Sequence, residues 1–298
     1  MTTFHYSDAF SRNIGWVTEA EQEILRRSRI AIGGLGGVGG VHLLTMARMG
    51  IGRFSIADLD VFEIGNFNRQ AGASIDTVGQ PKVEVMAQAL RSINPEVDLR
   101  SFPQGIQEST LDDFLDGVDL YLDGLDFFAF RVRRSVFAAC ERRGIPVVTA
   151  APLGFGTALI VFAPGGMPFE QYFGWDESDE LEMALRFLVG LSPAMLHRGY
   201  IADSTRIKLG EKRGPSSVAA CQLCAGIAAV EVLKILLKRD GVRLAPWASQ
   251  FDAYRMRFER TWRPFGAKNP LQRLMIALFK AQLARKISFL PAEKQRGR

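Results

Sequence analysis

A run of eight residues, GGLGGVGG at 33–40, limits what this chain can fold into more than any other feature of its sequence. The run follows the apolar segment Arg29–Ile32 and precedes a helical pattern that ends at Met49. A strand, a glycine turn and a helix in this order are the context in which the spacing G-x-G-x-x-G binds a nucleotide. Glycines let the main chain approach phosphates, and the helix N-terminus supplies amide donors. The segment therefore predicts a nucleotide-binding loop.

The wider pattern alternates short apolar runs with amphipathic segments. Thr18, followed three positions later by Glu21, is typical of a capping box at the start of a helix. Alternation of this kind predicts an α/β fold with a Rossmann-like, mainly parallel sheet flanked by helices. A long crossover insertion and a basic amphipathic C-terminal extension are expected to follow. We expect strands at 29–32, 53–57, 119–123, 146–149 and 158–162, and helices at 18–28, 38–49, 82–93, 131–143, 180–189 and 218–239.

Composition restricts where such a chain works. No uninterrupted stretch of eighteen apolar residues occurs, which argues against a membrane-spanning helix. Residues 1–12 lack the apolar centre of a signal peptide. Three cysteines are too few for a disulfide framework and are typical of a protein in a reducing compartment. We therefore expect a cytoplasmic protein.

The segment after the second expected strand indicates which nucleotide is bound. Asp58 ends that strand at the distance from the glycine run where an acidic side chain contacts ribose hydroxyls. Breaking the α–β bond of ATP requires positive charge on the phosphates, because negative charge moves onto the departing pyrophosphate. Arg69 and Lys82 supply that charge, and Asn68 and Gln70 add uncharged hydrogen-bond donors. The segment favours ATP over a nicotinamide dinucleotide.

A magnesium ion would also be needed, held by one or two carboxylates together with the phosphates. Asp126, which follows the strand at 119–123, is the expected ligand. Asp123 is a poorer candidate, because strand alternation and the following Gly124 leave the direction of its side chain undetermined.

Together these motifs resemble the ThiF/MoeB adenylyltransferases, relatives of the ubiquitin-activating enzymes. The resemblance covers residues 10–165 approximately and resumes at 214–237. It is identified from GGLGGVGG at 33–40, ADLD at 57–60, NFNRQ at 66–70, GQPKVE at 79–84 and LDGLDFFAFR at 122–131. The expected organisation is therefore an adenylation domain at 1–267, with an unmatched insertion at about 164–213, and a tail at 268–298.

The resemblance implies transfer of AMP from ATP to a carboxylate, often the C-terminus of a small ubiquitin-like carrier protein. It also implies a homodimer in which an N-terminal arginine, here Arg12, reaches the partner's ATP. It assigns ribose contact to Asp58, phosphate contact to Arg69 and Lys82, and magnesium or acyl-phosphate positioning to Asp126. The expected catalytic residues are thus Arg12, Arg69, Lys82 and Asp126, and Asp126 is also the expected metal ligand. The expected nucleotide-binding residues are Gly34, Gly36, Gly37, Gly39, Asp58, Asp60, Asn66, Asn68, Arg69, Gln70, Lys82 and Asp126.

Three positions depart from the pattern of that family. Many relatives bind structural zinc with two CxxC pairs, but here Cys221 and Cys224 form the one pair, so we expect no zinc. The segment 168–175, where relatives that form a thioester carry a cysteine, has none, and Cys140 reads as a core residue. Phe127 replaces the usual asparagine after Asp126. We therefore expect adenylation without a thioester on this chain, with specificity in the insertion, because loops carry variation.

Several alternatives stay open at this point. The activated carboxylate belongs to a peptide or small carrier protein in the main hypothesis, and to a modified nucleoside of tRNA in the second. The third alternative is a nucleotide-binding scaffold without catalytic activity, and the fourth is an NAD-dependent oxidoreductase. The presence of Arg69, Lys82 and Asp126 argues against the scaffold. Among the histidines, His42 reads as a helix residue and His197 as a weak candidate for substrate contact.

The C-terminal tail is strongly basic. From Tyr254 onward the chain has twelve Lys or Arg and two acidic residues. Apolar residues interleaved with the charges predict a basic amphipathic helix that docks on the protein itself, on RNA phosphates or on a membrane surface.

Overall fold

The computed structural model describes residues 3–175, 179–207 and 214–288, with side chains described as far as Ala281. Parts of the expected insertion (176–178 and 208–213) and of the expected tail (289–298) lie outside these residues. The helices are α1 Tyr6–Ala9, α2 Glu19–Arg27, α3 Gly39–Arg48, α4 Lys82–Ile93, α5 Leu111–Leu115, α6 Phe130–Arg143, α7 Phe169–Phe173, α8 Glu180–Leu191, α9 Val218–Leu236 and α10 Pro270–Ser288. The strands are β1 Arg29–Gly33, β2 Arg53–Ala57, β3 Asp98–Phe102, β4 Leu120–Asp123, β5 Val147–Leu153, β6 Gly156–Phe162, β7 Trp247–Asp252 and β8 Arg257–Trp262.

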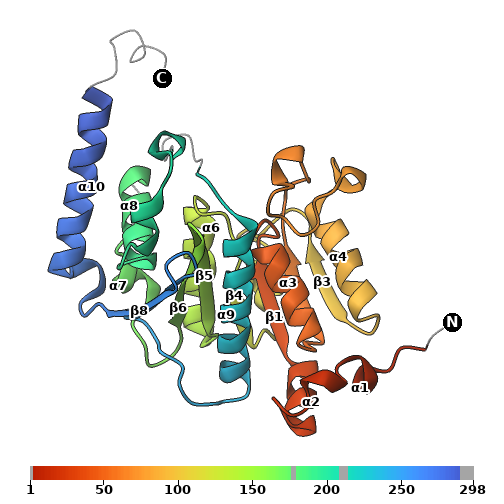
Figure 1. Ribbon diagram of the computed structural model, residues 1–298. Helices are drawn as coiled ribbons and strands as arrows, with labels where there is room; N and C mark the ends of the chain where they lie inside the picture. The colour runs from red at the N-terminus through yellow and green to blue at the C-terminus, as the bar shows by residue number, and fades with distance from the viewer. Residues whose placement is uncertain (1–2, 176–178, 208–213, 289–298) are drawn as a thin grey trace.

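The strands form one eight-stranded sheet in the order β3-β2-β1-β4-β5-β6-β7-β8 (Figure 1). The pairs from β3 to β5 are parallel, and the pairs from β5 to β8 are antiparallel. The chain crosses from β1 outward to β2 and β3, then returns to place β4 on the other side of β1. Strand order therefore reverses between β1 and β4, and ligands of open α/β sheets bind at such a point.

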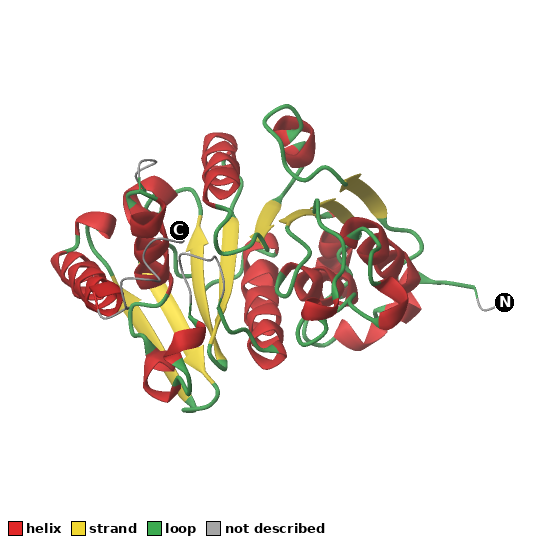
Figure 2. Ribbon diagram, turned by 90° about the horizontal axis from the view of Figure 1, so that it is seen from above, coloured by secondary structure: helices red, strands yellow, loops and turns green. Residues whose placement is uncertain are grey.

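Helices cover both faces of the sheet (Figure 2). In β1, Ile30 and Ile32 belong to a core shared with α3, α4 and α9, whereas Ala31 belongs to the opposite core with α5, α6, α7 and α8. This alternation follows from the period of two along a strand. Because both of their faces are buried, the inner strands β1 and β4 read as mainly apolar runs in the sequence.

Most of the expected elements are present at the expected places. The side chain of Thr18 accepts a hydrogen bond from the Glu21 amide, and the Glu21 carboxylate accepts one from the Thr18 amide, so the capping box is confirmed. α6 ends before Gly144, whose φ of 69° suits glycine. Three strands, β3, β7 and β8, were not expected. β3 and β8 are the two edge strands; most of their residues are exposed or half-buried, so neither carries an apolar run.

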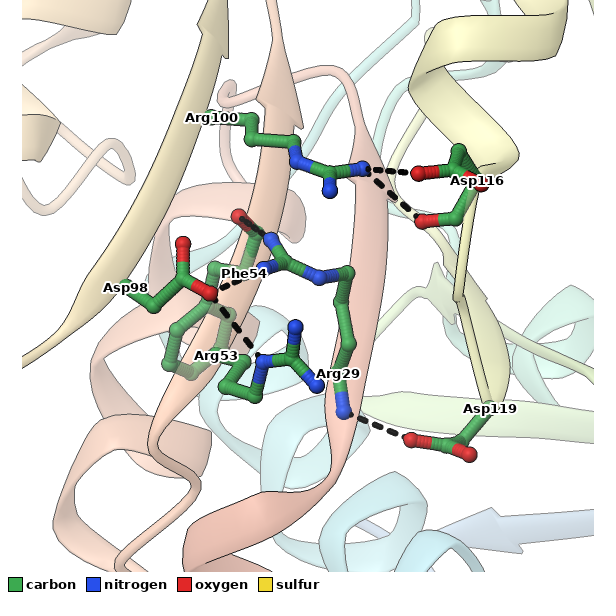
Figure 3. A network of polar contacts seen from close by, with 7 residues as sticks. All are labelled: Arg29, Arg53, Phe54, Asp98, Arg100, Asp116 and Asp119. Atoms are coloured by element: carbon green, nitrogen blue, oxygen red, sulfur yellow. Dashed lines mark hydrogen bonds and ion pairs between the residues drawn. The ribbon is translucent and has the colours of Figure 1, made fainter.

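A polar network ties the amino-terminal ends of the central strands together (Figure 3). Arg29 is fully buried, forms an ion pair with Asp98 and donates a hydrogen bond of 3.0 Å to the carbonyl oxygen of Phe54. Its amide donates to Asp119 over 2.8 Å, and Arg53 also pairs with Asp98 at 3.1 Å. Buried charges need partners of this kind. This edge of the sheet is held by charge pairs within the fold.

The C-terminal helix docks on the protein. Ile276 of α10 packs with Leu185 and Val189 of α8, with Met275 against the same cluster, and Lys280 pairs with Glu182. Three leucines of this helix are 56–70% exposed; these are Leu271, Leu274 and Leu278. Ile276 and the polar Gln272 take the buried positions.

α9 is long and apolar enough to cross a membrane by length and composition alone. In the structure it lies along β5 and β6 and contacts α3. Ala225 and Ala228 are buried in these contacts. α9 therefore occupies the position of a core helix of the sheet.

Candidate functional site

The expected site residues other than Arg12 lie at the carboxyl-terminal edge of β1, β2 and β4. The glycine run continues from β1 into α3, Asp58 follows β2 directly, and Asp126 lies three residues beyond β4. Arg69 and Gln70 come from the loop between β2 and α4, and Lys82 opens α4. Because carboxyl ends of parallel strands meet at one edge, segments far apart in the sequence converge there.

The tight packing of three glycines fixes the turn after β1. A Cβ atom on Gly39 would lie 1.8 Å from the carbonyl oxygen of Gly34, and one on Gly34 would lie 2.4 Å from that of Gly124. Gly34 also has a φ of 82°, which side chains rarely adopt. These glycines bring the start of α3, the end of β1 and the loop after β4 into main-chain contact.

Gly36 has more space, and Gly37 is intermediate. A Cβ atom on Gly36 would meet nothing closer than the Gln70 Nε2 atom at 3.7 Å, whereas one on Gly37 would lie 3.2 Å from Sγ of Cys221 and 3.3 Å from Cγ of Arg69. Among the described residues, no side chain caps the N-terminus of α3. The amides at this helix end are thus available to an anion.

Asp58 ties the end of β2 to the glycine turn. Its Oδ2 atom accepts the Leu35 amide at 2.6 Å, and its Oδ1 atom accepts the Asp60 amide at 2.8 Å. Asp60 in turn holds Lys82, whose Nζ atom lies 3.0 Å from the Asp60 Oδ2 atom. The Lys82 side chain is only 7% exposed, whereas Asp60 is well exposed. The ion pair fixes the position of the Lys82 charge at the edge of the sheet.

The loop after β2 lies over the glycine turn. Arg69 donates to the Gly65 carbonyl oxygen at 3.1 Å and to the Asn68 Oδ1 atom at 2.9 Å. Asn68 donates to the carbonyl oxygen of Ser216, just before α9. Gln70 is buried, and its Oε1 atom has no partner within the described part of the protein. Asn66 caps a short turn by accepting the Glu63 amide.

The two aspartates after β4 point in different directions. Asp126 is exposed, and its Oδ1 atom accepts the Phe128 amide at 2.9 Å. Asp123 is buried; its Oδ2 atom pairs with Arg133 at 3.0 Å and accepts the Thr149 hydroxyl at 2.7 Å. Asp123 is therefore occupied within the fold, and Asp126 is the carboxylate that faces solvent. The sequence did not indicate Arg133, because an arginine on a helix usually reads as a surface residue.

Phe127, the residue that replaces the usual asparagine, is packed into the protein. Its ring lies 5.1 Å from that of Phe187 in α8 and 4.9 Å from that of Phe128. The insertion therefore contacts the loop that carries Asp126. That the insertion also sets specificity stays a prediction.

Arg12 does not lie near the glycine turn of its own chain. It belongs to a 3₁₀ turn at Ser11–Asn13, and its neighbour Asn13 donates to the Met49 carbonyl oxygen at 3.3 Å. Met49 follows the C-terminal end of α3, whereas the glycine turn lies at the N-terminal end (Figure 1). A helix of this length spans about 15 Å, so the structure separates Arg12 from the other expected site residues.

The cysteines and His42 are buried. Cys140 belongs to the apolar core, and burial raises the pKa of its thiol to about 12, which confirms it as a core residue. Cys224 donates to the Thr157 hydroxyl, and burial raises its pKa to about 12. Among the described residues, no three His, Cys, Asp or Glu side chains are grouped to hold a metal. Burial lowers the pKa of His42 to about 3, and neither of its ring nitrogens has a partner there.

These residues fit a nucleoside triphosphate with magnesium. The helix end without a side-chain cap and the open Gly36 suit phosphates, and Arg69 and Lys82 supply positive charge. Asp126 is exposed and, unlike Asp60, makes no ion pair within the described part of the protein. It matches the ligand set of magnesium, which takes one or two carboxylates and completes its shell with phosphates and water.

Comparison with known proteins agrees with this arrangement. The tRNA threonylcarbamoyladenosine dehydratase of Bacillus subtilis (strain 168) is 35% identical over 142 residues, 47% of this chain and 55% of that protein. The sulfur carrier protein ThiS adenylyltransferase of Escherichia coli (strain K12) is 31% identical over 191 residues, 63% of this chain and 74% of that protein. The chain thus spans about half the length of the first relative and about three quarters of the second.

Solved structures share the fold. The crystal structure of E. coli MccB with MccA-N7isoASN matches with a TM-score of 0.66 and 19% identity, over 89% of this chain and 73% of that one. The model of the ThiF family matches residues 10–273, which include every expected site residue. On this evidence, the chain belongs to the ThiF family.

Proposed function

We propose that this protein is an ATP-dependent adenylyltransferase that activates a carboxylate as an acyl-adenylate and releases pyrophosphate. The observation that supports this most is that two cations and an exposed carboxylate without an ion pair in the described residues lie near the glycine turn. Arg69 packs against Gly37, Lys82 is fixed by Asp60, and Asp126 follows the Gly124 contact. Breaking the α–β bond of a triphosphate needs cations and a metal ligand for the charge that develops, whereas hydride transfer from a dinucleotide breaks no phosphate bond.

Each residue then has a role in the reaction. The glycine turn and the start of α3 bind phosphate oxygens through main-chain amides. Arg69 and Lys82 stabilise the negative charge that grows on the departing pyrophosphate as the carboxylate oxygen bonds to the α-phosphorus. Asp58 lies beside the turn, where it can accept ribose hydroxyls. Magnesium, when bound, supplies further charge stabilisation on the phosphates, with Asp126 as its protein ligand.

The acyl substrate is proposed to be the C-terminal carboxylate of a peptide or small carrier protein. The ThiS adenylyltransferase, whose name gives a sulfur carrier protein as its substrate, is the relative of which this chain covers 74%. Segment 168–175 has no cysteine, so the acyl-adenylate would react with an external amine or thiol or an internal amide. We place this enzyme in the cytoplasm, in keeping with its three buried, free cysteines.

A second candidate substrate is a carboxylate on modified tRNA. It is favoured by the 35% identity to a tRNA threonylcarbamoyladenosine dehydratase and by the basic C-terminal segment. The two candidates differ in an observable way. A tRNA substrate predicts that RNA co-purifies with the protein and that binding weakens steeply as salt rises.

The proposed nucleotide can be tested with a glycine variant. Saturating magnesium-ATP is expected to raise the melting temperature of the wild type by several degrees, since ligand at one hundred times its dissociation constant adds about 2.7 kcal/mol. NAD is expected to give no shift. Gly36→Ala should melt like the wild type without ligand, because its Cβ meets nothing within 3.7 Å, but should lose most of the ATP shift. Stabilisation by NAD alone would favour the oxidoreductase, and stabilisation by ATP without acyl-dependent pyrophosphate exchange would favour the silent scaffold.

We also propose a homodimer in which Arg12 acts on the nucleotide of the partner. Its separation from the glycine turn of its own chain supports this, as does the neighbouring Trp16, which is 84% exposed. Arg12→Ala and Asp126→Ala should each be inactive alone, whereas mixed dimers of the two should recover up to about a quarter of wild-type exchange. That quarter assumes random pairing in an equal mixture, where half of the dimers each hold one intact site. Confirmed mixed dimers without recovery would place Arg12 outside the partner's site.

A further inference from the structure

We propose that Arg133 is a positioning residue for Asp126, acting through the main chain of the loop that follows β4. The inference rests on the proposed function, because the role of Asp126 belongs to that proposal. Arg133 lies in the first turn of α6, two residues beyond the segment that resembles the family motif, and its side chain is 2% exposed.

A buried ion pair anchors the Arg133 guanidinium. Its Nε atom lies 3.0 Å from the Asp123 Oδ2 atom, which also accepts the Thr149 hydroxyl of β5 at 2.7 Å. Asp123 ends β4, so the guanidinium is fixed to the centre of the sheet. Both side chains are buried and have hydrogen-bond partners, and a buried ion pair with these partners keeps a defined geometry.

The two Nη atoms of Arg133 donate hydrogen bonds to the loop. Nη2 donates to the carbonyl oxygens of Leu125 at 2.8 Å and Asp126 at 3.0 Å, and Nη1 donates to that of Phe127 at 3.2 Å. One side chain thus binds three consecutive carbonyl oxygens, with Asp126 in the middle. The Asp126 carboxylate in turn accepts the Phe128 amide, so its direction depends on the same short stretch of main chain.

The insertion covers the other side of this arrangement. The guanidinium carbon of Arg133 lies 4.7 Å from the centroid of the Phe187 ring in α8, and Phe127 packs on the same ring. The Phe187 ring of α8 therefore contacts both the guanidinium and the loop that it binds. An arginine suits this position because its planar fork has five donors and stacks on aromatic faces, whereas a lysine has three donors at one point.

Arg29 provides a matched control. Like Arg133 it is fully buried, pairs with one aspartate and donates to a main-chain carbonyl oxygen. It begins β1, whereas Asp126 follows the end of the parallel strand β4, so the two lie at opposite edges of the sheet. Arg133→Lys and Arg29→Lys should both lower the melting temperature, since each keeps the charge but loses donors. Only the first should alter the loop.

The first measurement is hydrogen exchange on the protein without ligand. The amides of Phe128 and Ala129 bond to the Asp126 side chain and carbonyl oxygen respectively. Their exchange should be about tenfold faster or more in Arg133→Lys, as expected for hydrogen bonds lost from a charged donor, and unchanged in Arg29→Lys. Unchanged exchange in Arg133→Lys would overturn the proposal.

The second measurement is the dependence of ATP affinity on magnesium, taken as the ratio of the dissociation constants in EDTA and in magnesium chloride. Arg133→Lys should reduce this ratio about tenfold while leaving ATP affinity in EDTA unchanged, since losing the support of a metal ligand costs that much or more. In an Asp126→Ala background, Arg133→Lys should have no further effect on the ratio.

The outcomes separate the two proposals. Two results would overturn the positioning role and leave Arg133 as a structural residue. One is faster amide exchange in Arg133→Lys with an unchanged ratio of ATP dissociation constants. The other is a further change of that ratio by Arg133→Lys in the Asp126→Ala background. A wild type that binds no ATP would overturn the proposed function, and the positioning role with it.

Discussion

Replacing Arg69 with alanine is expected to slow ATP–pyrophosphate exchange by about a hundredfold to a thousandfold, the cost of removing one donor aimed at charge that develops in the transition state. Arg69 is half-buried and rests against Gly37, so its charge reaches the place where phosphates would meet the helix end. Asp126→Asn should cause a loss of similar size, because an amide does not replace a carboxylate on magnesium. The measurement is incorporation of labelled pyrophosphate into ATP, driven by the peptide, carrier protein or tRNA that supports exchange in the wild type.

Arg143→Ala is the control for this pair. Arg143 is also an arginine with a carboxylate partner, Asp112, but it lies at the end of α6, away from the glycine turn. Its loss should leave exchange close to that of the wild type, since exposed ion pairs contribute little to stability. Near-normal exchange in both Arg69→Ala and Asp126→Asn would contradict the site assignment.

The second large effect concerns stability and pH. Burial lowers the pKa of His42 to about 3, so the folded protein keeps His42 neutral where the unfolded chain takes up a proton near pH 6.5. The unfolded state binds more protons between these values, and stability must fall as the pH falls through them. His42 alone should cost about 2 kcal/mol between pH 6.5 and pH 5.0, at about 1.4 kcal/mol per pH unit.

His42→Leu should remove that part of the pH dependence. Leucine has a similar volume and leaves no ring nitrogen unpartnered, so stability at pH 7.5 should be unchanged or higher. Urea unfolding at several pH values above 5 measures the difference, and this range avoids the carboxylates with lowered pKa values, such as Asp98 and Glu182. Burial also lowers the pKa of His197, so some pH dependence should remain in His42→Leu. A variant with the slope of the wild type would contradict the assignment to His42.

Local signals in the sequence were enough to place much of the fold. The capping box at Thr18, the glycine turn and the helix at 82–93 depend on residues within one short segment, and the structure has each of them. The site followed from the same kind of signal, because strands that end in Gly33, Ala57 and Asp123 are parallel neighbours. Parallel pairing then brings the residues after each strand to one edge.

The features that could not be predicted from the sequence depend on contacts between segments that are distant along the chain. The direction of Asp123 is decided by Arg133 on α6 and Thr149 on β5, neither of which is visible in the pattern around β4. The buried face of α10 is decided by Leu185 and Val189 of α8, which the pattern of apolar residues within α10 does not reveal. The strand β8 is an edge strand of mixed polarity, which carries little periodic signal.

The contact among Gly34, Gly39 and Gly124 has a consequence for how this chain can evolve. The first obstacle to a side chain at each of these positions is main chain: a Cβ atom on Gly124 would lie 2.6 Å from the Gly34 carbonyl oxygen. Shortening a side chain elsewhere cannot relieve a clash with the main chain. Second-site suppressors of substitutions at these three glycines should therefore be almost absent from a random library. Gly36, whose neighbours leave space, should instead accept alanine wherever selection acts on folding alone. Within the glycine run, main-chain packing therefore requires glycine at positions 34 and 39, whereas at position 36 only the ligand would.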